Sequence, residues 1–478
     1  MRLCLLYPPR SGGRGTNLVP PVGLLYLAAV LERAGHAVVL IDATQRNLAG
    51  EPLAEAIAEA RPDVVGVTAF TSDMPALSRE LPRIRSLLPD SPIWVGGPHP
   101  SSVGSRIFDE LPEIDAAFIG EAEDSVLEMI DFERSPGGQA PDGVLAREQR
   151  SRETHARHVS DLGSLPVPAW HHAPPESYRG LPNGVVLKRT PYAPVLTTRG
   201  CPYSCTFCAG HRVTGKRLRH RPMDQVWEEI ELLVGRYGVR EIHIEDDNFT
   251  LDHGYAMEFC SRAVESALPV LYSTPNGVRL DSLDGELLDS MKRAGWYIVH
   301  CGIESGSDRV LDLIMKQTDT GAVSRAVDLI RSHGLQVAGY FILGLPCETE
   351  ADMLETIAFA RRSRMEWAHF ACFLPLPGSR DGEEYFSRHP EARGDWDRFH
   401  NTACPAPPEG ISPRRMKQIQ KKAFLSFYLR PAHFLRVLSL MFHRGTARRL
   451  LSRFAAYLLG ERSIKASGPC PGPMEDDG

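Results

Sequence analysis

Residues 199–208 read Arg199-Gly200-Cys201-Pro202-Tyr203-Ser204-Cys205-Thr206-Phe207-Cys208, which places three thiols within eight residues. Their spacing is Cys-x3-Cys-x2-Cys. Zinc sites usually take four ligands, often as two Cys-x2-Cys pairs, and this loop has no local fourth ligand. Three thiolates on a cubic [4Fe–4S] cluster leave one iron with an open coordination position. The loop therefore predicts an iron–sulfur centre, and the alternatives are an incomplete zinc knuckle or a chance cluster.

Around and after this loop, apolar segments alternate with amphipathic helical stretches such as 223–237, 284–294 and 322–333. Six βα repeats of this kind predict a partial or full TIM-like barrel of parallel strands. Chemistry in such barrels gathers at the carboxyl ends of the strands, so the loops after each strand should carry the site. The expected strands are Pro194–Thr198, Glu241–Glu245, Val270–Thr274, Tyr297–Glu304, Gln336–Leu343 and Ala368–Leu374.

The N-terminal part shows the same alternation on a shorter period, with helices expected near 23–34, 53–60 and 75–88. Continuous apolar strands separated by helices indicate a parallel sheet covered on both faces. This pattern predicts an open, doubly wound, Rossmann-like domain whose ligand lies beyond the strand carboxyl ends. The expected strands are Arg2–Tyr7, Ala37–Ile41, Asp63–Ala69, Pro92–Val95 and Asp115–Ile119.

The chain is thus expected to be an α/β protein in four parts. Residues 1–132 form the first domain, 133–192 a proline-rich linker, 193–378 the barrel and 379–478 a helical, basic C-terminal region. A length of 478 residues fits two or three domains, and 42% hydrophobic residues are enough for buried cores. No segment has the apolar length of a membrane span, the start is too short for a signal peptide, and the ten cysteines are not spaced like a disulfide scaffold. These features predict a reduced, cytoplasmic protein.

The net charge of −6 is the sum of two opposed regions. Residues 411–465 contain thirteen Lys or Arg and one acid, a local charge of +12, which leaves −18 for the rest. Apolar side chains interleave with these basic residues. Either the segment is a helical cap that packs on the barrel, or it is an interfacial surface that docks on anionic lipid at the inner membrane face. A nucleic-acid site is not expected, because no recognised fold accompanies the charge.

The cysteine loop, with aromatic Phe207 before its last cysteine and six βα units around it, resembles the signature of the radical SAM superfamily. The resemblance implies that Cys201, Cys205 and Cys208 hold a [4Fe–4S] cluster. It implies further that the open iron binds S-adenosylmethionine (SAM), which yields a 5′-deoxyadenosyl radical that removes a hydrogen from the substrate. An electron donor such as flavodoxin or ferredoxin is then needed.

Other strand ends fit SAM contacts of the kind that the resemblance implies. Asp246 and Asp247 would hold the amino group, or would only cap a helix. Arg279 would meet the SAM carboxylate, or would form a structural salt bridge. Glu304 would accept hydrogen bonds from the ribose. The expected SAM-binding residues are Phe207, Asp246, Asp247, Arg279, Glu304 and Gly344.

The strand-end loops of the N-terminal domain are similar to those of the cobalamin-binding domain that precedes the barrel in cobalamin-dependent radical SAM enzymes. Small residues would let a flat corrin lie against the sheet edge, and no Gly-x-Gly-x-x-Gly dinucleotide motif follows the first strand. His99 would contact corrin amides or stabilise its own turn, and a scaffold that binds nothing remains the alternative. The expected cobalamin-binding residues are Gly23, Thr71, Ser72, Gly96, Gly97, Pro98, His99, Gly120 and Glu121.

One departure concerns the cobalt. The loop at 42–47 lacks the Asp-x-His-x-x-Gly motif that supplies a cobalt-ligating histidine in methionine-synthase-like domains, so no histidine is expected to replace the cobalamin tail. A single cluster is expected because the N-terminal domain has only Cys4 and the tail only Cys404 and Cys470.

The resemblance implies a C-methyltransferase that moves a methyl group from methylcobalamin to an unactivated carbon of a small-molecule or lipid-like substrate. One alternative is a cyclase or ring-rearranging enzyme that uses both cofactors without methyl transfer. An alternative of another class is a non-catalytic cobalamin-binding sensor, against which the intact cysteine triad argues.

Overall fold

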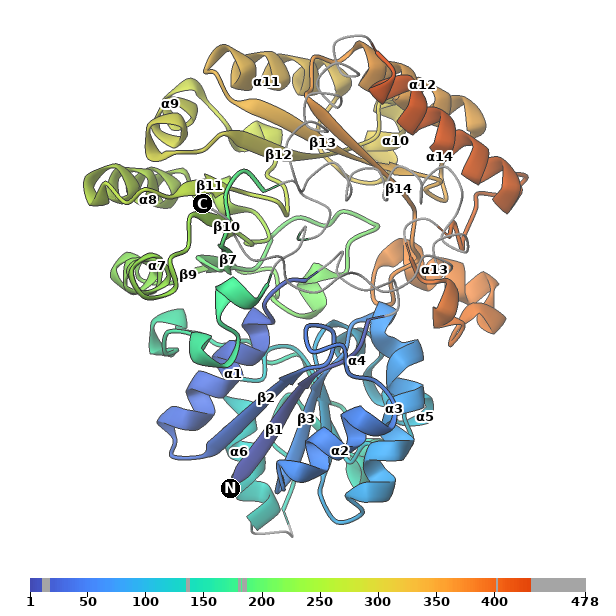
Figure 1. Ribbon diagram of the computed structural model, residues 1–478. Helices are drawn as coiled ribbons and strands as arrows, with labels where there is room; N and C mark the ends of the chain where they lie inside the picture. The colour runs from blue at the N-terminus through green and yellow to red at the C-terminus, as the bar shows by residue number, and fades with distance from the viewer. Residues whose placement is uncertain (11–17, 135–137, 179–181, 183–186, 401–402, 431–478) are drawn as a thin grey trace, which may run out of the picture.

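The computed structural model describes residues 1–10, 18–134, 138–178, 182, 187–400 and 403–430. Figure 1 shows two α/β halves, one above the other, with the N-terminal domain in blue below the green-to-orange barrel. Among the described residues, no helix combines the length and the apolar character needed to cross a membrane.

The N-terminal domain is built on a six-stranded sheet in the order β2-β1-β3-β4-β5-β6. β1 to β5 are parallel, whereas β6 runs antiparallel to β5. Alternate residues of the central strand β1 enter separate cores: Leu3 and Leu5 face one side and Cys4 and Leu6 the other. The expected doubly wound sheet is therefore confirmed. Its strands are β1 Arg2–Tyr7, β2 Ala37–Asp42, β3 Val64–Thr68, β4 Ile93–Gly96, β5 Ala116–Phe118 and β6 Val144–Ala146.

Helices connect these strands and cover both faces of the sheet (Figure 1). β1 lies between β2 and β3, so the strand order changes direction there, which is where such sheets bind ligands beyond their carboxyl ends. The helices are α1 Val22–Arg33, α2 Glu51–Glu59, α3 Met74–Leu87, α4 Pro98–Val103, α5 Ile107–Glu110 and α6 Ser125–Arg134.

The barrel strands form two parallel three-stranded sheets, β11-β10-β7 and β12-β13-β14. Isolated bridges join Tyr272 to Trp296 and Val278 to Cys301 between them. The strands of the described residues do not close into a ring, so the barrel is a partial one. The strands are β7 Tyr192–Val195, β10 Glu241–Ile244, β11 Leu271–Ser273, β12 Ile298–Glu304, β13 Gln336–Leu343 and β14 Trp367–Cys372.

The barrel helices begin and end at residues suited to those positions. The side chains of Asp252, Asp284 and Asp319 accept hydrogen bonds from backbone N–H groups at the starts of α8, α9 and α11. Left-handed Gly238 and Gly295 end α7 and α9. The helices are α7 Met223–Tyr237, α8 His253–Ser266, α9 Gly285–Ala294, α10 Asp308–Leu313, α11 Thr320–Ser332 and α12 Glu350–Arg362.

The C-terminal region adds α13 Arg380–Arg388 and α14 Pro413–Tyr428. α14 packs along α12 and β14 (Figure 1), and its buried face includes Met416, Ile419 and Phe427. The first part of the basic segment is therefore a cap on the barrel. Residues 431–465 lie outside the described residues, so membrane contact stays a prediction.

Two features of the fold were not expected from the sequence. β6 comes from the stretch 133–192 and extends the N-terminal sheet. Cys372 at the end of β14 forms a disulfide with Cys404, 32 residues further along the chain. The expectation of a reduced protein does not hold for this pair.

Candidate functional site

The cysteine loop follows β8 Thr198–Arg199, which pairs antiparallel with β9 Arg219–His220. Gly200 lies between β8 and Cys201 with φ at 100°, and a Cβ there would fall 2.2 Å from the carbonyl oxygen of Arg217. Only glycine fits this turn. The Cys201 N–H donates to the Gly215 carbonyl at 3.2 Å, which ties the first cysteine to the returning chain. The short ladder therefore holds the thiol-bearing loop closed at its base.

All three cysteines of the loop are free thiols, with Cys201 and Cys205 partly buried and Cys208 exposed. Desolvation raises the pKa of each thiol, and that of Cys208 to about 11, where the Cys205 and Cys201 thiols contribute further. Binding to a metal centre deprotonates such thiols, because the positive charge stabilises the thiolate. Three free thiols close enough to influence one another thus fit an iron–sulfur cluster.

The spacing of the thiols argues against a single tetrahedral ion. Zn–S bonds of about 2.3 Å bring thiolates within about 4 Å of one another. Among the described residues, only one group of three metal-ligating side chains has its ligand atoms within 4.8 Å, and it does not include these cysteines. The thiols are therefore spread more widely than one zinc ion requires.

The structure separates the two carboxylates that follow β10. Asp246 is buried and accepts hydrogen bonds from the backbone N–H and hydroxyl groups of Thr197 and Thr198, at 2.5–3.0 Å. Burial raises its pKa to about 6, against the effect of these hydrogen bonds. Asp247 is exposed and accepts hydrogen bonds from Gly200 N–H at 3.1 Å and the Thr214 hydroxyl at 2.7 Å. Asp246 thus joins β10 to the first barrel strand, whereas Asp247 lies on the cysteine loop.

Glu245, just before this pair, is a residue that sequence reasoning did not select. Its carboxylate oxygen Oε1 is buried and has no hydrogen-bond partner. Burial raises its pKa to about 7, with His243 lowering it and Asp246 raising it. A buried carboxyl oxygen without a partner is costly, so this position is suited to a ligand that donates a hydrogen bond. Its signal in the sequence was its place at the end of a barrel strand.

Arg279 lies against the cysteine loop. Its guanidinium stacks over the Tyr203 ring at 3.8 Å and pairs with Asp281 at 2.7 Å. It also donates to the carbonyl of Lys316 at 2.8 Å. These contacts place a cation beside the thiol of Cys205, and a contact of Arg279 with the SAM carboxylate stays a prediction.

Glu304 ends β12 with φ at 69°, and its carboxylate accepts a hydrogen bond from Lys316 Nζ at 2.8 Å. Both side chains are largely buried, and both influence the Cys205 thiol. A left-handed conformation in a residue other than glycine is sparsely populated and gathers at functional sites. Glu304 and Lys316 thus form an ion pair beside the cysteine loop.

Gly344 follows β13, and its N–H donates to Glu348 Oε2 at 2.6 Å. The other oxygen of Glu348 is buried without a hydrogen-bond partner, and burial raises the pKa of this carboxyl to about 8. Phe207 packs on a small apolar cluster that includes Leu345 and Phe373. The structure therefore brings the loops after β13 and β14 to the last part of the cysteine loop.

In the N-terminal domain, His99 has its hydrogen-bonding groups engaged inside the protein. It is fully buried, with Nδ1 3.0 Å from the Thr71 hydroxyl and Nε2 2.8 Å from Glu110 Oε2. Trp396 donates to the same Glu110 oxygen at 2.8 Å and packs edge-on against the His99 ring. These are the contacts of a turn-stabilising histidine, and its contact with corrin amides stays a prediction.

The glycines expected at the corrin edge differ in their surroundings. A Cβ at Gly97, where φ is 102°, would lie 2.9 Å from the Thr68 hydroxyl, and one at Gly120 would lie 2.3 Å from the Arg157 carbonyl. A Cβ at Gly23 would meet nothing within 4 Å, so the start of α1 is open. Gly96 ends β4 and Pro98 begins α4, while Ser72 lies beside Thr71. Their roles toward cobalamin are predictions.

A buried ion network joins the two domains at the cysteine loop. Arg219 of β9 donates to both oxygens of Glu121, at 2.7 and 2.8 Å, and Arg199 of β8 pairs with Glu123 at 2.7 Å. All four side chains are at least nine-tenths buried. Glu121 and Glu123 follow β5. These ion pairs therefore join the carboxyl edge of the N-terminal sheet to β8 and β9, the two strands on either side of the loop that contains the thiols. The carboxylate of Glu121, expected at cobalamin, is used in this network.

A second contact also joins the N-terminal domain to the region of the cysteine loop. α4, which follows β4, packs against residues Gly210–Arg212 directly after the last cysteine. The loops expected to bind cobalamin thus face the loop expected to bind the cluster.

The sequence matches two known families. Residues 195–360 match the Radical SAM superfamily, and residues 13–130 match the B12 binding domain. A cytidylyl-2-hydroxyethylphosphonate methyltransferase of Streptomyces wedmorensis is 30% identical over 75% of this chain and 76% of its own. An uncharacterised methyltransferase of Pyrococcus horikoshii is 29% identical over 90% and 93%. An anaerobic magnesium-protoporphyrin IX monomethyl ester cyclase of Rubrivivax gelatinosus is 28% identical over 79% and 69%.

Solved structures share the fold. The radical SAM methyltransferase TsrM of Kitasatospora setae, solved with cobalamin and a [4Fe–4S] cluster, superposes with a TM-score of 0.66 at 19% identity, over 81% of this chain and 75% of its own. The cobalamin-dependent radical SAM enzyme OxsB with aqua-cobalamin has a TM-score of 0.63 at 16% identity, over 87% and 60%.

Proposed function

Since the chain belongs to the cobalamin-dependent radical SAM enzymes, we propose that it is a C-methyltransferase acting on a small-molecule substrate. Its cofactors are a [4Fe–4S] cluster, SAM and cobalamin. When bound, these groups supply a 5′-deoxyadenosyl radical and a transferable methyl group, and the protein orients them and excludes water. The methyl acceptor would be an unactivated substrate carbon.

The observation that carries this proposal is the buried contact between the two domains. Glu121 and Glu123 bind Arg219 and Arg199 on either side of the cysteine loop. This contact would hold cobalamin, bound at the strand ends of the N-terminal domain, on a surface that faces the thiols. Methyl transfer to a substrate radical requires both groups to reach one substrate carbon, and fixed facing surfaces meet that requirement.

Different residues of the barrel would bind the cluster and SAM. Cys201, Cys205 and Cys208 would hold the cluster, and exposed Asp247 would accept from the SAM ammonium. Glu245 has an unpartnered oxygen and a pKa of about 7, and would accept a hydrogen bond from substrate or SAM. Asp246 would act indirectly, by fixing the strand that carries Asp247.

A second candidate function is cyclisation without net methyl transfer. The relatives named as magnesium-protoporphyrin IX monomethyl ester cyclases favour it, because they match 70–79% of this chain, about as much as the 75% that the cytidylyl-2-hydroxyethylphosphonate methyltransferase matches. Methyltransferases of two substrate types are also among the relatives, including a bacteriochlorophyllide d C-12(1)-methyltransferase of Chlorobaculum tepidum.

The proposal is tested by anaerobic reconstitution with iron, sulfide and cobalamin, followed by SAM under strong reductant. We expect both 5′-deoxyadenosine and S-adenosylhomocysteine, and we expect the second product to disappear when cobalamin is omitted. Formation of 5′-deoxyadenosine alone in the presence of cobalamin would favour the cyclase. Cobalamin binding without any SAM cleavage would identify a non-catalytic binding protein.

A further inference from the structure

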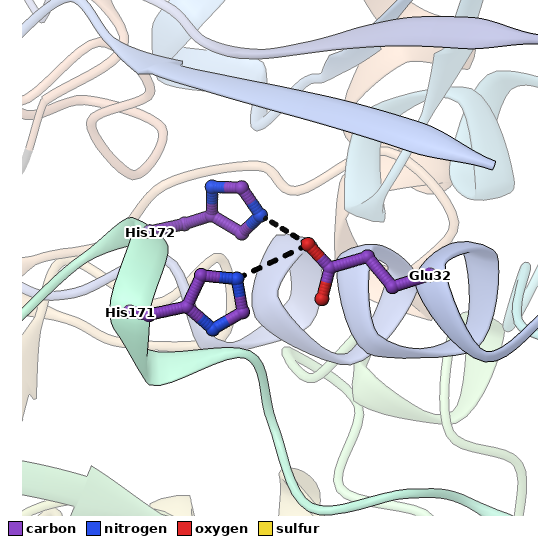
Figure 2. Close-up of side chains that lie close together, drawn as sticks. All are labelled: Glu32, His171 and His172. Carbon is purple, nitrogen blue, oxygen red and sulfur yellow. Dashed lines mark hydrogen bonds and ion pairs between the residues drawn. The ribbon is translucent and has the colours of Figure 1, made fainter. Parts of the chain in front are cut away.

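Three metal-ligating side chains that are separate from the cysteine loop in sequence lie close together, and each is exposed or half-buried. Glu32 lies near the end of α1, and His171 and His172 lie on the turn Trp170–His172. Figure 2 shows both imidazole rings directed from the turn toward the Glu32 carboxylate. The set contains two imidazole nitrogens and one carboxylate oxygen, which are ligands that zinc prefers.

The distances are close to those of an occupied site. Nε2 of His172 lies 2.8 Å and Nε2 of His171 lies 3.1 Å from the same oxygen, Oε1 of Glu32. The three ligand atoms all lie within 4.8 Å of one another, a property of no other such trio among the described residues. Tetrahedral zinc with bonds near 2.0–2.1 Å separates its ligands by about 3.3 Å. Both nitrogen–oxygen distances are within about half an ångström of this separation, and the two imidazole nitrogens lie within 4.8 Å of each other, so side-chain adjustments would let the three atoms surround one ion.

The turn that carries the histidines is held in place before any ion binds. The Ala169 N–H donates to the Leu25 carbonyl of α1 at 3.1 Å. Trp170 is 1% exposed, and its indole N–H donates to Glu229 Oε1 of α7 at 3.0 Å. These bonds fix the turn between a helix of each domain. Preorganised ligands of this kind lower the cost of binding an ion.

We propose that Glu32, His171 and His172 bind a divalent transition-metal ion, for which Zn²⁺ fits the ligand set, with a fourth position open to water. Both histidines belong to the segment between the domains, and Glu32 belongs to the N-terminal domain. The ion would therefore clamp this segment onto α1. The proposal does not rest on the proposed methyl transfer.

The experiment uses the full chain as holoenzyme, free of any affinity tag, so that the cluster cysteines are already occupied by iron. The protein is equilibrated with Zn²⁺ and dialysed, and zinc and iron are counted together. We expect about one zinc per chain with iron unchanged, and zinc X-ray absorption showing imidazole and oxygen neighbours. The zinc should also raise the midpoint of thermal unfolding.

The matched variants separate this site from adventitious binding. The double variant His171→Ala/His172→Ala should lose the zinc and its thermal effect, and Glu32→Gln should bind at least about tenfold more weakly. His333→Ala, which removes one histidine paired with Asp289 at 2.5 Å, should bind zinc like the wild type. Equal zinc in the wild type and the double variant, no zinc in either, or sulfur neighbours in the absorption spectrum would overturn the proposal.

Discussion

The strand carboxyl ends of the N-terminal sheet and those of the barrel face one another, but their polar groups differ in how many have partners inside the protein. At the N-terminal edge, the side chains of His99 and Glu121 already have partners inside the protein. At the barrel edge, three thiols are free and carboxyl oxygens of Glu245 and Glu348 are buried without hydrogen bonds. Because buried polar groups are normally satisfied, the second edge is the one built for charged or coordinating ligands. The N-terminal edge would instead bind a ligand through its shape, its backbone groups and its small residues.

The largest effect should come from the barrel edge. Cys205→Ser should abolish cluster assembly and SAM cleavage, since a cluster held by two thiolates loses its site-differentiated iron. Iron and sulfide content and 5′-deoxyadenosine formation measure the effect. Cys347→Ser, which alters a partly buried thiol outside the triad, should keep both. If Cys205→Ser still cleaves SAM, the thiols do not have the assigned role.

The second largest effect should come from the ion pairs that join the two edges. Arg199→Met leaves the carboxylate of Glu123 buried without its cation and should lower the free energy of unfolding by about 3–5 kcal/mol. Urea denaturation measures the loss. Arg150→Met breaks an exposed pair with Asp109 and should cost less than about 1 kcal/mol. Equal costs for the two variants would mean that the interdomain network contributes no more than a surface pair.

The buried carboxyl of Glu348, one oxygen of which has no hydrogen-bond partner, predicts a pH dependence of stability. Its pKa rises from an ordinary 4.5 to about 8 on folding, so the folded state binds the proton more tightly than the unfolded state. Stability from this group is complete below about pH 4.5 and is lost as the pH rises to about 8. Glu348→Gln should therefore be more stable than the wild type at pH 8, by roughly 2–4 kcal/mol, and equal to it at pH 4.5.

The control for this experiment is Glu350→Gln, because Arg415 lowers the pKa of that exposed carboxyl. Its stability should follow the wild-type slope between pH 5 and pH 8. A Glu348→Gln variant whose pH slope matches the wild type would show that the Glu348 carboxyl titrates normally and that the comparison of the two edges is wrong.

The smallest effect should come from the crowded glycine of the N-terminal edge. Gly97→Ala and Gly104→Ala both place a side chain at positive φ and should each cost about 1–3 kcal/mol. Only the Cβ at position 97 would press on Thr68 and Ala69, so only this variant should bind cobalamin more weakly. Equilibrium dialysis with aquacobalamin measures the affinity of each variant for the cofactor. Equal affinities would show that the Gly97 turn does not shape the cobalamin edge.

The regular elements could be predicted because their signal is local. Apolar runs placed β1 and β13 at the residues where they occur. The other expected strands lie within two residues of the observed ones, except that the first barrel strand ends at Val195, three residues before its expected end. β6 was missed because it lies in a stretch rich in proline and glycine that is typical of a linker, and its antiparallel pairing with β5 is a contact that no local pattern records. The barrel was expected as partial or full, and its division into two sheets depends on long-range pairing that no local pattern records.

The cluster-binding residues of the candidate site could be predicted from the sequence, but the contacts between its side chains could not. The cysteine spacing is a local pattern, so the triad could be named. The pairing of Glu121 with Arg219 joins residues 98 positions apart, and the different roles of Asp246 and Asp247 depend on which of them faces inward. Glu245 looked like an ordinary strand end, because burial without a partner is visible only after folding.

The two facing edges are proposed to act on one substrate carbon, and the destination of a labelled methyl group shows whether they do. The reconstituted enzyme is given SAM with a deuterated methyl group, reductant and candidate substrate extracts, and products are followed by mass spectrometry. We predict that a product gains the labelled methyl group while 5′-deoxyadenosine and S-adenosylhomocysteine form together. A product that forms with 5′-deoxyadenosine but carries no label and no accompanying S-adenosylhomocysteine would contradict the account.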